Sequence, residues 1–341
     1  MSTLVPITVT SDEETLVTHR IHQLPVLVIF PHNQCNCRCV MCDIWRIREA
    51  QQIKPADLGS HLGSFRELGV QWVVFSGGEP QLNEKWSGLA QILRSADIRV
   101  TMLTAGLLLK AQAKTVAECI DDVIVSLDGP PAIHNSIRRV AGAFEKMAEG
   151  VQSIHEFRPG MAVRARCTVQ KANRNSLREV VATAKQIGLT SVSFLAADLT
   201  SSAFNRPDGW GPDHSGRVSL TSQEANELET EIERLIVEER EHPGFVVETP
   251  AKLRRIVQHF RAHLGEATET APRCNAPWVS AVVEASGDLR PCFFHPVLGN
   301  IHSQSLTAIL NGPEALHFRA NLDVATNPTC RRCVCSLHIP K

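Results

Sequence analysis

Three cysteines near the start of the chain have a spacing that can hold a metal cluster. Cys35, Cys39 and Cys42 lie in the segment CNCRCVMCDIW with the pattern C-x3-C-x2-C. Iron–sulfur clusters are bound by cysteine thiolates, normally four, so three from one loop would leave one iron of a [4Fe–4S] cluster open. An open metal position can bind a reactant. A zinc knot is the alternative that this spacing permits. Cys37 stands between these residues, and we expect it to pack, because neighbouring side chains in an extended loop point apart.

A second group of cysteines lies near the other end. Cys274 and Cys292 are followed by the pair Cys330 and Cys333 in a C-x2-C spacing, and then by Cys335. Two separated cysteines with a C-x2-C pair suit a tetrahedral zinc site as well as an iron–sulfur cluster. In a reducing compartment such groups indicate metal or redox chemistry rather than disulfides. The two cysteines outside both groups, Cys119 and Cys167, are expected to be small buried hydrophobes.

Charge and hydropathy exclude some classes of partner. The 341 residues carry a formal net charge of −1 and no Lys/Arg-rich run, so nucleic acid binding has no electrostatic support. The first 20 residues lack the apolar core of a signal peptide. No segment approaches the roughly 18 to 20 apolar residues that span a membrane. We therefore expect a cytoplasmic protein with neither a nucleic acid partner nor a membrane span.

Strand-like and helix-like segments alternate through the first two hundred residues. The expected strands are 26–30, 72–76, 99–104, 123–127, 162–169 and 191–195, and the expected helices are 55–68, 84–95, 110–119, 143–156 and 175–187. Six such units in succession predict a parallel sheet with helices outside it. Periodicity alone leaves a partial barrel and a doubly wound sheet both open.

The remaining sequence changes character twice. Residues 199–217 are rich in Gly, Pro, Ser and Asp and predict a loop. Thr221 and Glu224 form a capping box that opens a helix to about residue 240, and a second helix is expected over 251–264. Beyond a boundary at 265–273 the chain predicts short strands, turns and the second group of cysteines.

Two further motifs follow expected strands. Gly77-Gly78-Glu79-Pro80 follows the second, and Ser126-Leu127-Asp128-Gly129 ends the fourth. With the three-cysteine loop after the first strand, the chain resembles the radical S-adenosylmethionine (SAM) superfamily. This resemblance implies an α/β fold, a partial (β/α)6 TIM-like barrel, whose strand ends bind the ligand. In that family the methionine part of SAM chelates the open iron, and electron transfer produces a 5′-deoxyadenosyl radical that abstracts hydrogen from the substrate.

The resemblance also implies roles for individual residues in binding SAM. The GGEP turn would contact the methionine amino group, Ser126 with Asp128 nearby would contact the ribose, and Arg138 would pair with the methionine carboxylate. Two positions depart from the family. Thr104 is followed by Ala-Gly where relatives often have Asn-Gly, and Met41 stands where relatives often place an aromatic residue against adenine. Leu195, at the end of the sixth strand, is a weaker adenine contact.

The second group of cysteines resembles the twitch domain, a short form of the SPASM extension of some radical SAM enzymes. That resemblance implies one auxiliary [4Fe–4S] cluster on Cys274, Cys292, Cys330 and Cys333. Candidates for contact with substrate are Cys335, His295 and Asp198. The expected domains are an N-terminal extension (1–23), the barrel (24–198), a connector made of a loop and helices (199–270), and the auxiliary domain (271–341).

The expected cofactors are therefore two [4Fe–4S] clusters and SAM, with a flavodoxin- or ferredoxin-type electron donor. The expected reaction is oxidation or rearrangement of a small molecule such as a sugar or aminocyclitol. Radical modification of a ribosomally made peptide is the alternative. It is slightly disfavoured because only about 25 residues precede the first strand, whereas peptide-modifying relatives often carry a leader-binding domain. A non-enzymatic zinc or iron–sulfur binding protein is the rival from another class.

Overall fold

The parallel sheet is a partial barrel. The computed structural model describes residues 17–207 and 209–340. The first six strands are β1 (Val26–His32), β2 (Trp72–Gly77), β3 (Arg99–Thr104), β4 (Asp122–Ser126), β5 (Val163–Val169) and β6 (Val192–Ala196). They are parallel and lie in sequential order, and the sheet continues from β1 to β7 rather than to β6. A doubly wound sheet would reverse its strand order at a switch point, so the expected partial barrel is confirmed.

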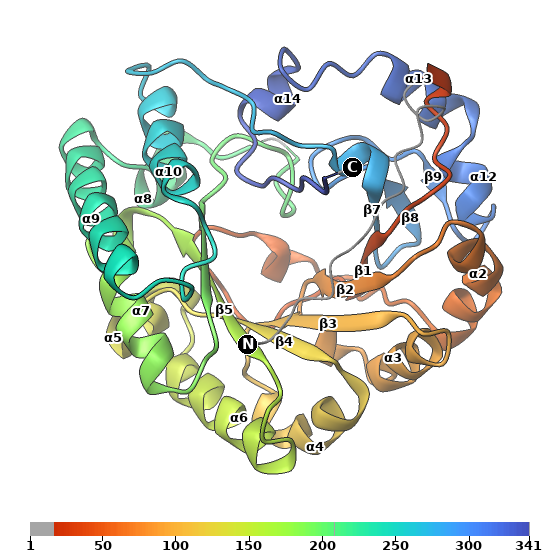
Figure 1. The fold of residues 1–341 in the computed structure, drawn as a ribbon, viewed down its shortest axis with the longest axis horizontal. Helices are drawn as coiled ribbons and strands as arrows, with labels where there is room; N and C mark the ends of the chain where they lie inside the picture. The colour runs from red at the N-terminus through yellow and green to blue at the C-terminus, as the bar shows by residue number, and fades with distance from the viewer. Residues whose placement is uncertain (1–16, 208, 341) are drawn as a thin grey trace.

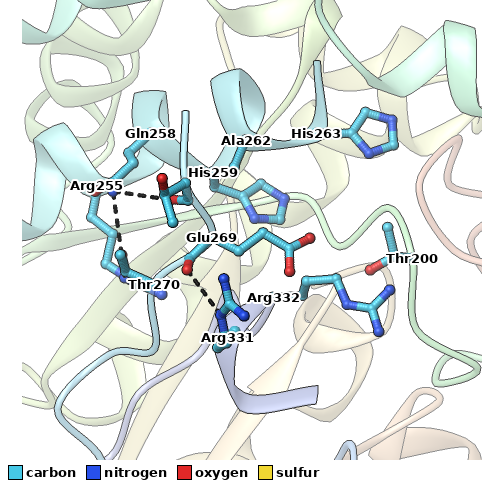
Figure 2. A pocket seen from close by; sticks show the side chains of 11 residues that line it. Thr200, Arg255, Gln258, His259, Ala262, His263, Glu269, Thr270, Arg331 and Arg332 are labelled. Atoms are coloured by element: carbon cyan, nitrogen blue, oxygen red, sulfur yellow. Dashed lines mark hydrogen bonds between the residues drawn. The ribbon is translucent and has the colours of Figure 1, made fainter. Parts of the chain in front are cut away.

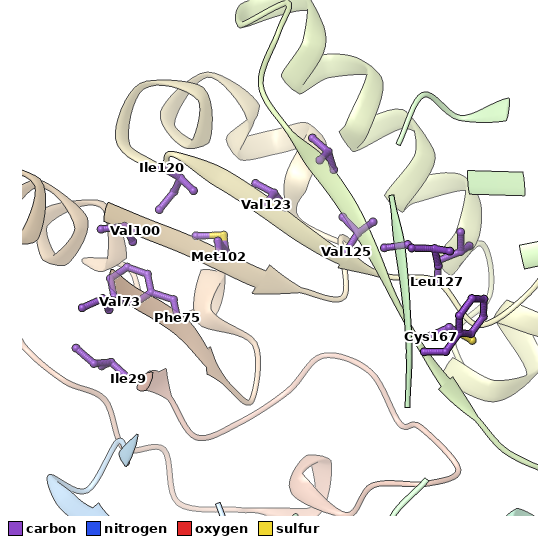
Figure 3. Close-up of a cluster of buried hydrophobic side chains, with 14 of the residues drawn as sticks. Ile29, Val73, Phe75, Val100, Met102, Ile120, Val123, Val125, Leu127 and Cys167 are labelled. Carbon is purple, nitrogen blue, oxygen red and sulfur yellow. The ribbon is translucent and has the colours of Figure 1, made fainter. Parts of the chain in front are cut away.

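Helices cover the outer side of the curved sheet (Figure 1). They are α2 (Pro55–Glu67), α3 (Trp86–Arg94), α4 (Leu109–Cys119), α6 (Ala143–Phe157) and α7 (Leu177–Gln186), each close to its expected range. Alternate strand residues such as Val73, Met102 and Val125 point toward these helices and form the core (Figure 3). Cys119 and Cys167 are buried in this core, which confirms the expectation for both.

The opposite face of the strands points into the barrel and is partly polar. At its amino-terminal end, buried Asp122 accepts hydrogen bonds from Arg99 Nε and Thr101 Oγ1, each at 2.9 Å, and pairs with Arg164. Arg99 and Arg164 thus both form ion pairs with the Asp122 carboxylate. At this end of the barrel the inner charged side chains are therefore paired with one another.

The segment after β6 is only partly a loop. Helix α8 (Pro212–Val218) lies where residues 199–217 were expected to be irregular. Pro212 at its first position explains the start, because proline suits the first turn of a helix. The longer helices α9 (Ser222–Glu241) and α10 (Pro250–His263) match expectation, and Thr221 N–H donates to Glu224 Oε2 at 2.9 Å in the predicted capping box.

The cysteine-rich C-terminal part extends the barrel sheet. Strand β7 (Ser280–Val283) pairs in parallel with β1, and β8 (Asp288–Arg290) and β9 (Gly299–Asn300) follow in antiparallel order. Short helices complete this part, namely α11 (Ala276–Val279), α12 (Leu306–Leu310), α13 (Pro313–Ala320) and α14 (Pro328–Arg331). None of the helices in the described residues is long and apolar enough to cross a membrane.

The start of the described chain is attached to this C-terminal part. Asn311 Oδ1 accepts from Ile21 N–H at 2.7 Å, and Arg319 donates to the carbonyl of His19 at 2.6 Å. Residues 1–16 of the expected N-terminal extension lie outside the described residues.

Gly150 permits the close packing of α4 against α6. A Cβ at this position would overlap Cβ of Leu109, whereas a Cβ at Gly63 on α2 would meet nothing within 4 Å. Gly150→Ala is expected to lower the free energy of unfolding by about 1–3 kcal/mol, because overpacking forces the two helices apart. Gly63→Ala is the matched control and should raise it by up to about 1 kcal/mol through helix propensity. Urea denaturation measures both, and stabilisation by both substitutions would contradict the tight packing.

Candidate active site

The three-cysteine loop lies directly after β1, at the carboxyl-terminal ends of the strands. Cys39 is buried, and Cys35 and Cys42 are partly buried. Cys37 is only 1% exposed and packs with Cys39 and Ala105, yet its side chain does not point away from its neighbours. Its thiol contacts those of Cys35 and Cys39, and these contacts together with burial raise the pKa of Cys37. The expectation that these side chains diverge is therefore wrong, because residues two apart in an extended segment point to the same side.

One side of the loop is held by the chain that follows β4. The N–H groups of Arg38 and Val40 donate to the carbonyls of Arg138 and Ile137, at 3.1 and 3.0 Å. Both carbonyls belong to the last turn of α5 (Pro131–Arg138), a helix that the sequence did not predict. The last carbonyls of a helix lack partners within the helix, so the cysteine loop satisfies them while being held in place.

The other side of the loop is held by the segment after β6. Asp43 N–H donates to the Phe204 carbonyl at 3.2 Å, and Asn205 Nδ2 donates to the Asp43 carbonyl at 3.0 Å. Trp210 Nε1 donates to Asp43 Oδ2 at 2.7 Å. His214, on α8, contacts the Val40 carbonyl through Nε2 at 3.0 Å. Sequence reasoning missed these contacts, although a lone tryptophan in a Gly- and Pro-rich segment was a usable signal.

The GGEP turn lies against the cysteine loop. Glu79 N–H donates to the Gln34 carbonyl at 2.8 Å. A Cβ at Gly78 would overlap that same carbonyl, and one at Gly77, whose φ is +94°, would overlap the Phe30 ring. The close approach that the two glycines allow is therefore to the chain's own loop. Pro80 is buried and begins a short 3-10 helix.

The Glu79 carboxylate is fully buried and hydrogen-bonded within the chain. It accepts from Thr104 Oγ1 and Ala105 N–H, both at 2.9 Å, and from Gln81 N–H at 3.3 Å. Burial raises the pKa of Glu79, while these bonds and the charge of Arg138 oppose the rise. Glu79 and Thr104 thus tie the GGEP turn to the end of β3.

Arg138 pairs with Asp128 beside the cysteine loop. Its Nη2 lies 2.6 Å from Asp128 Oδ2, and its Nη1 lies 3.5 Å from Cys39 Sγ. Both side chains are buried, and Asp128 Oδ1 also accepts from Thr168 N–H at 3.1 Å. Arg138 Nε is buried and has no hydrogen-bond partner. An unused donor on a guanidinium beside Cys39 fits an anionic group, such as the carboxylate of SAM, bound at this loop.

Of the other predicted SAM contacts, Ser126 and Leu195 lie at or near strand ends and Met41 lies in the cysteine loop. Ser126 is 9% exposed, and its hydroxyl has no hydrogen-bond partner among the described residues. Leu195 is partly exposed on β6, on the face opposite the buried Phe194. Met41 is partly buried and packs against the core as well as against Cys37 and Cys39.

The C-terminal cysteines Cys274, Cys292, Cys330 and Cys333 lie close enough to affect one another electrostatically. Burial raises the pKa of Cys292 to about 12, and the nearby Cys274 and Cys330 add to the rise. Burial is also the main cause that raises the pKa of the Cys333 thiol, and the nearby Cys335 and Cys274 add to that rise. In the part of the chain that the structure describes, no three His, Cys, Asp or Glu side chains converge as a single metal ion would require. A four-iron cluster is held by four cysteine thiolates, one on each iron, and these four residues supply that number.

Two of the three candidates for substrate contact are already engaged. Asp198 is buried, pairs with Arg206 and accepts a hydrogen bond from Ser201. His295 is buried, and its Nε2 lies 3.4 Å from Cys330 Sγ. Asp198 therefore anchors the segment after β6, and His295 supports a cysteine.

Cys335 lies beside Cys333, whose thiol donates to the Cys335 carbonyl at 2.9 Å, and the Cys335 thiol is near Arg166 of β5. Burial raises the pKa of its thiol, and the charge of nearby Arg166 opposes that rise. Arg166 pairs with Ser126 in strand register and alternates with the buried core residue Cys167, so its side chain is on the inner face. The Arg166 side chain has no ion pair or hydrogen bond among the described residues, and its Nε is buried without a partner. Sequence reasoning missed it, although arginines at alternate positions of the apolar segment VRARCTV were the signal.

Family models match both parts of the chain. The radical SAM superfamily matches residues 29–195, and an iron–sulfur cluster-binding domain of the SPASM type matches residues 274–334. Fe-coproporphyrin III synthase of Methanosarcina barkeri is 31% identical over 173 residues, which are 48% of this chain and 42% of that protein. Pre-heme d1 synthase of Dinoroseobacter shibae is 25% identical over 339 residues, covering 92% of this chain and 79% of that protein.

A solved structure has the same fold. Streptococcus suis SuiB bound to the precursor peptide SuiA superposes with a TM-score of 0.68 at 15% identity, covering 96% of this chain and 74% of that chain. Identity this low relates the folds alone, whereas the two family matches cover both groups of cysteines. The chain therefore belongs to the radical SAM superfamily and is an enzyme that uses S-adenosylmethionine and [4Fe–4S] clusters, with a C-terminal SPASM-type domain.

Proposed function

We propose that Cys35, Cys39 and Cys42 hold the SAM-binding cluster and that Cys274, Cys292, Cys330 and Cys333 hold an auxiliary cluster. When bound, the first cluster and SAM supply a one-electron reductive cleavage that produces a hydrogen-abstracting radical. The protein contributes position and shielding. The gathered thiols and the tethered loop after β1 carry this assignment.

The residues around the loop then have distinct roles toward SAM. Arg138 offers its unused Nε–H to the methionine carboxylate while Asp128 keeps the guanidinium oriented. The Ser126 hydroxyl is free to bind the ribose. Met41 and Leu195 offer apolar surface to adenine. Gly77, Gly78, Glu79, Pro80 and Thr104 act by positioning, because their close contacts and hydrogen bonds hold the cysteine loop and the end of β3.

The substrate we propose is a small molecule that carries a carboxylate. The observation that supports the carboxylate is Arg166, whose guanidinium on the inner face of the barrel has no counter-ion among the described residues. The Arg166 side chain is partly buried and its Nε is buried without a partner, so a bound carboxylate would give that donor an acceptor. Arg166 favours an anionic substrate over the neutral sugar or cationic aminocyclitol considered from the sequence. Two relatives are named for coproporphyrin and heme products, and tetrapyrroles of this kind bear carboxylate side chains.

A peptide substrate is the second candidate. The supporting observation is that SuiB, solved with its precursor peptide, has the same fold over most of this chain. A peptide carboxylate could also meet Arg166, so the guanidinium does not separate the two candidates. The two candidates are separated by testing a peptide and a carboxylate-bearing small molecule side by side as substrates.

The first prediction concerns cluster content. Anaerobic reconstitution should give about eight irons and eight sulfides per chain, and dithionite with SAM should yield 5′-deoxyadenosine. Cys39→Ala should abolish 5′-deoxyadenosine formation, Cys333→Ala should leave about four irons, and the core control Cys119→Ala should keep about eight. Iron and sulfide analysis with chromatography of the nucleoside measures these outcomes. Two zinc ions per chain without labile sulfide would show instead that the protein binds zinc.

The second prediction concerns Trp210. Trp210→Phe removes the indole N–H that holds Asp43 but keeps an aromatic ring beside Arg206. Loss of one hydrogen bond to a carboxylate, worth about 1.5–3 kcal/mol, should accelerate iron loss from the first cluster to a chelator by about tenfold or more. The measurement is made in the Cys333→Ala background. Trp278→Phe is the control, because that indole N–H has no hydrogen bond to any residue that the structure describes, and equal rates for both variants would contradict the tether.

The third prediction concerns Arg166. Iron coproporphyrin III should bind the reconstituted enzyme more tightly than its methyl ester, which lacks the carboxylates. Arg166→Gln should weaken binding of the acid by about 10- to 100-fold, as expected for a charged hydrogen bond worth about 1.5–3 kcal/mol, and Arg166→Lys should restore part of it. Affinity is read from the absorbance change on titration. Equal affinities for acid and ester in the wild-type enzyme would exclude carboxylate recognition of this ligand.

A further inference from the structure

Arginines gather around a hollow beside the C-terminal cysteines. The hollow is shallow and lies between α10, the segment 265–273 and α14 (Figure 2). Arg255, Arg331 and Arg332 line it, together with His259 and His263. Arg331 and Arg332 are the two residues between Cys330 and Cys333, and Arg255 donates to the Cys333 carbonyl at 3.3 Å. The positive groups are thus built onto the loop that carries two of the proposed cluster ligands.

These three arginines are not neutralised by carboxylates. Arg255 donates to Thr270 Oγ1, Arg331 to the Glu269 carbonyl and Arg332 to the Pro328 carbonyl, at 3.0 to 3.2 Å. All the acceptors are neutral oxygens, and no ion pair involves these arginines among the described residues. Glu269 contributes the one carboxylate among the residues that line the hollow.

Other arginines nearby behave differently. On the same helix, Arg254 pairs with Glu233 and Arg261 with Glu229, both at 2.6 Å. His259 adds no charge near neutral pH, because burial lowers its pKa to about 4. The chain as a whole carries a formal charge of −1, so the positive potential at the hollow is local. Such a patch attracts an acidic partner and steers its approach.

We propose that this hollow is the docking site of an acidic electron-transfer protein of the flavodoxin or ferredoxin type. The inference rests on the proposed auxiliary cluster at Cys274, Cys292, Cys330 and Cys333. A reduced carrier gives up one electron and the cluster takes up one, and an oxidised carrier reverses the transfer, with no bond made or broken. The arginines place the carrier at the loop between Cys330 and Cys333, which is the covalent connection to the cluster. The contact is a small, salt-sensitive one of the kind that transient redox partners form.

The test measures binding as well as electron transfer. Oxidised flavodoxin is titrated into the holoenzyme, and the dissociation constant is determined by calorimetry at low and at high salt. Replacing both arginines, Arg331→Gln with Arg332→Gln, should raise the dissociation constant by about tenfold at low salt and flatten its salt dependence. The control has the same change of charge at exposed positions of α9, Arg234→Gln with Arg240→Gln, and should change the constant less than about twofold.

A conservative pair separates charge from folding. Arg331→Lys with Arg332→Lys should retain most of the affinity and the salt dependence, even if the glutamine pair lowers the iron content. In stopped-flow experiments, reduced flavodoxin should reduce the glutamine pair more slowly than the wild type, while reduced methyl viologen, a small cation, should reduce both at similar rates.

Several results would overturn the inference. These are equal losses of flavodoxin affinity in the α9 control, no loss in the glutamine pair, or equally tight binding of an unstructured Glu-rich peptide of the same net charge. Failure of the proposed function gives a different result: the enzyme would form no 5′-deoxyadenosine even when methyl viologen is the reductant.

Discussion

The site depends on how a loop without regular structure is held still. Residues 35–43 carry the three cysteines, and hydrogen bonds from three segments distant in the sequence fix their backbone. The last turn of α5 accepts from one side, the chain near Phe204 and Trp210 holds Asp43 on the other, and the GGEP turn lies against Gln34. Because each segment follows a different strand, the barrel must be assembled before the thiols have defined positions.

One face of the strands forms the apolar core, and the other face carries the polar side chains of the candidate site. Outward residues such as Val73 and Met102 form an apolar core with the helices, so the fold does not require the inner face to be apolar. That face therefore accommodates arginines with different partners. Arg164 is neutralised by Asp122 at the amino-terminal end of the barrel, whereas Arg166, two residues later on β5, has no counter-ion among the described residues. Such an unpaired charge is stable only where solvent or a ligand reaches it.

Pairing of β7 with β1 links the two groups of cysteines. The three-cysteine loop follows β1, and Cys292 follows β8, so both are attached to one continuous sheet. Aromatic contacts add to this connection. The ring centroids of Phe293 and Phe30 are 5.6 Å apart, and those of Phe294 and Phe204 are 6.3 Å apart. A shared sheet gives the two groups a defined separation, which one-electron exchange between them would require.

The sequence by itself determined the six strand–helix units, the cysteine spacings and the motifs at strand ends, because these depend on local periodicity and residue type. Periodicity left the barrel and the doubly wound sheet both open, since only long-range strand pairing distinguishes them, and the expectation of a partial barrel came from the family resemblance. The short helices α5 and α8 were missed, because helices of one or two turns are stabilised by tertiary packing more than by propensity. Tertiary structure alone decided that Glu79 and Asp198 are hydrogen-bonded to neighbours, while Arg166 has no charged partner within residues 17–207 and 209–340. The identity of a charged residue does not reveal whether folding brings it a partner.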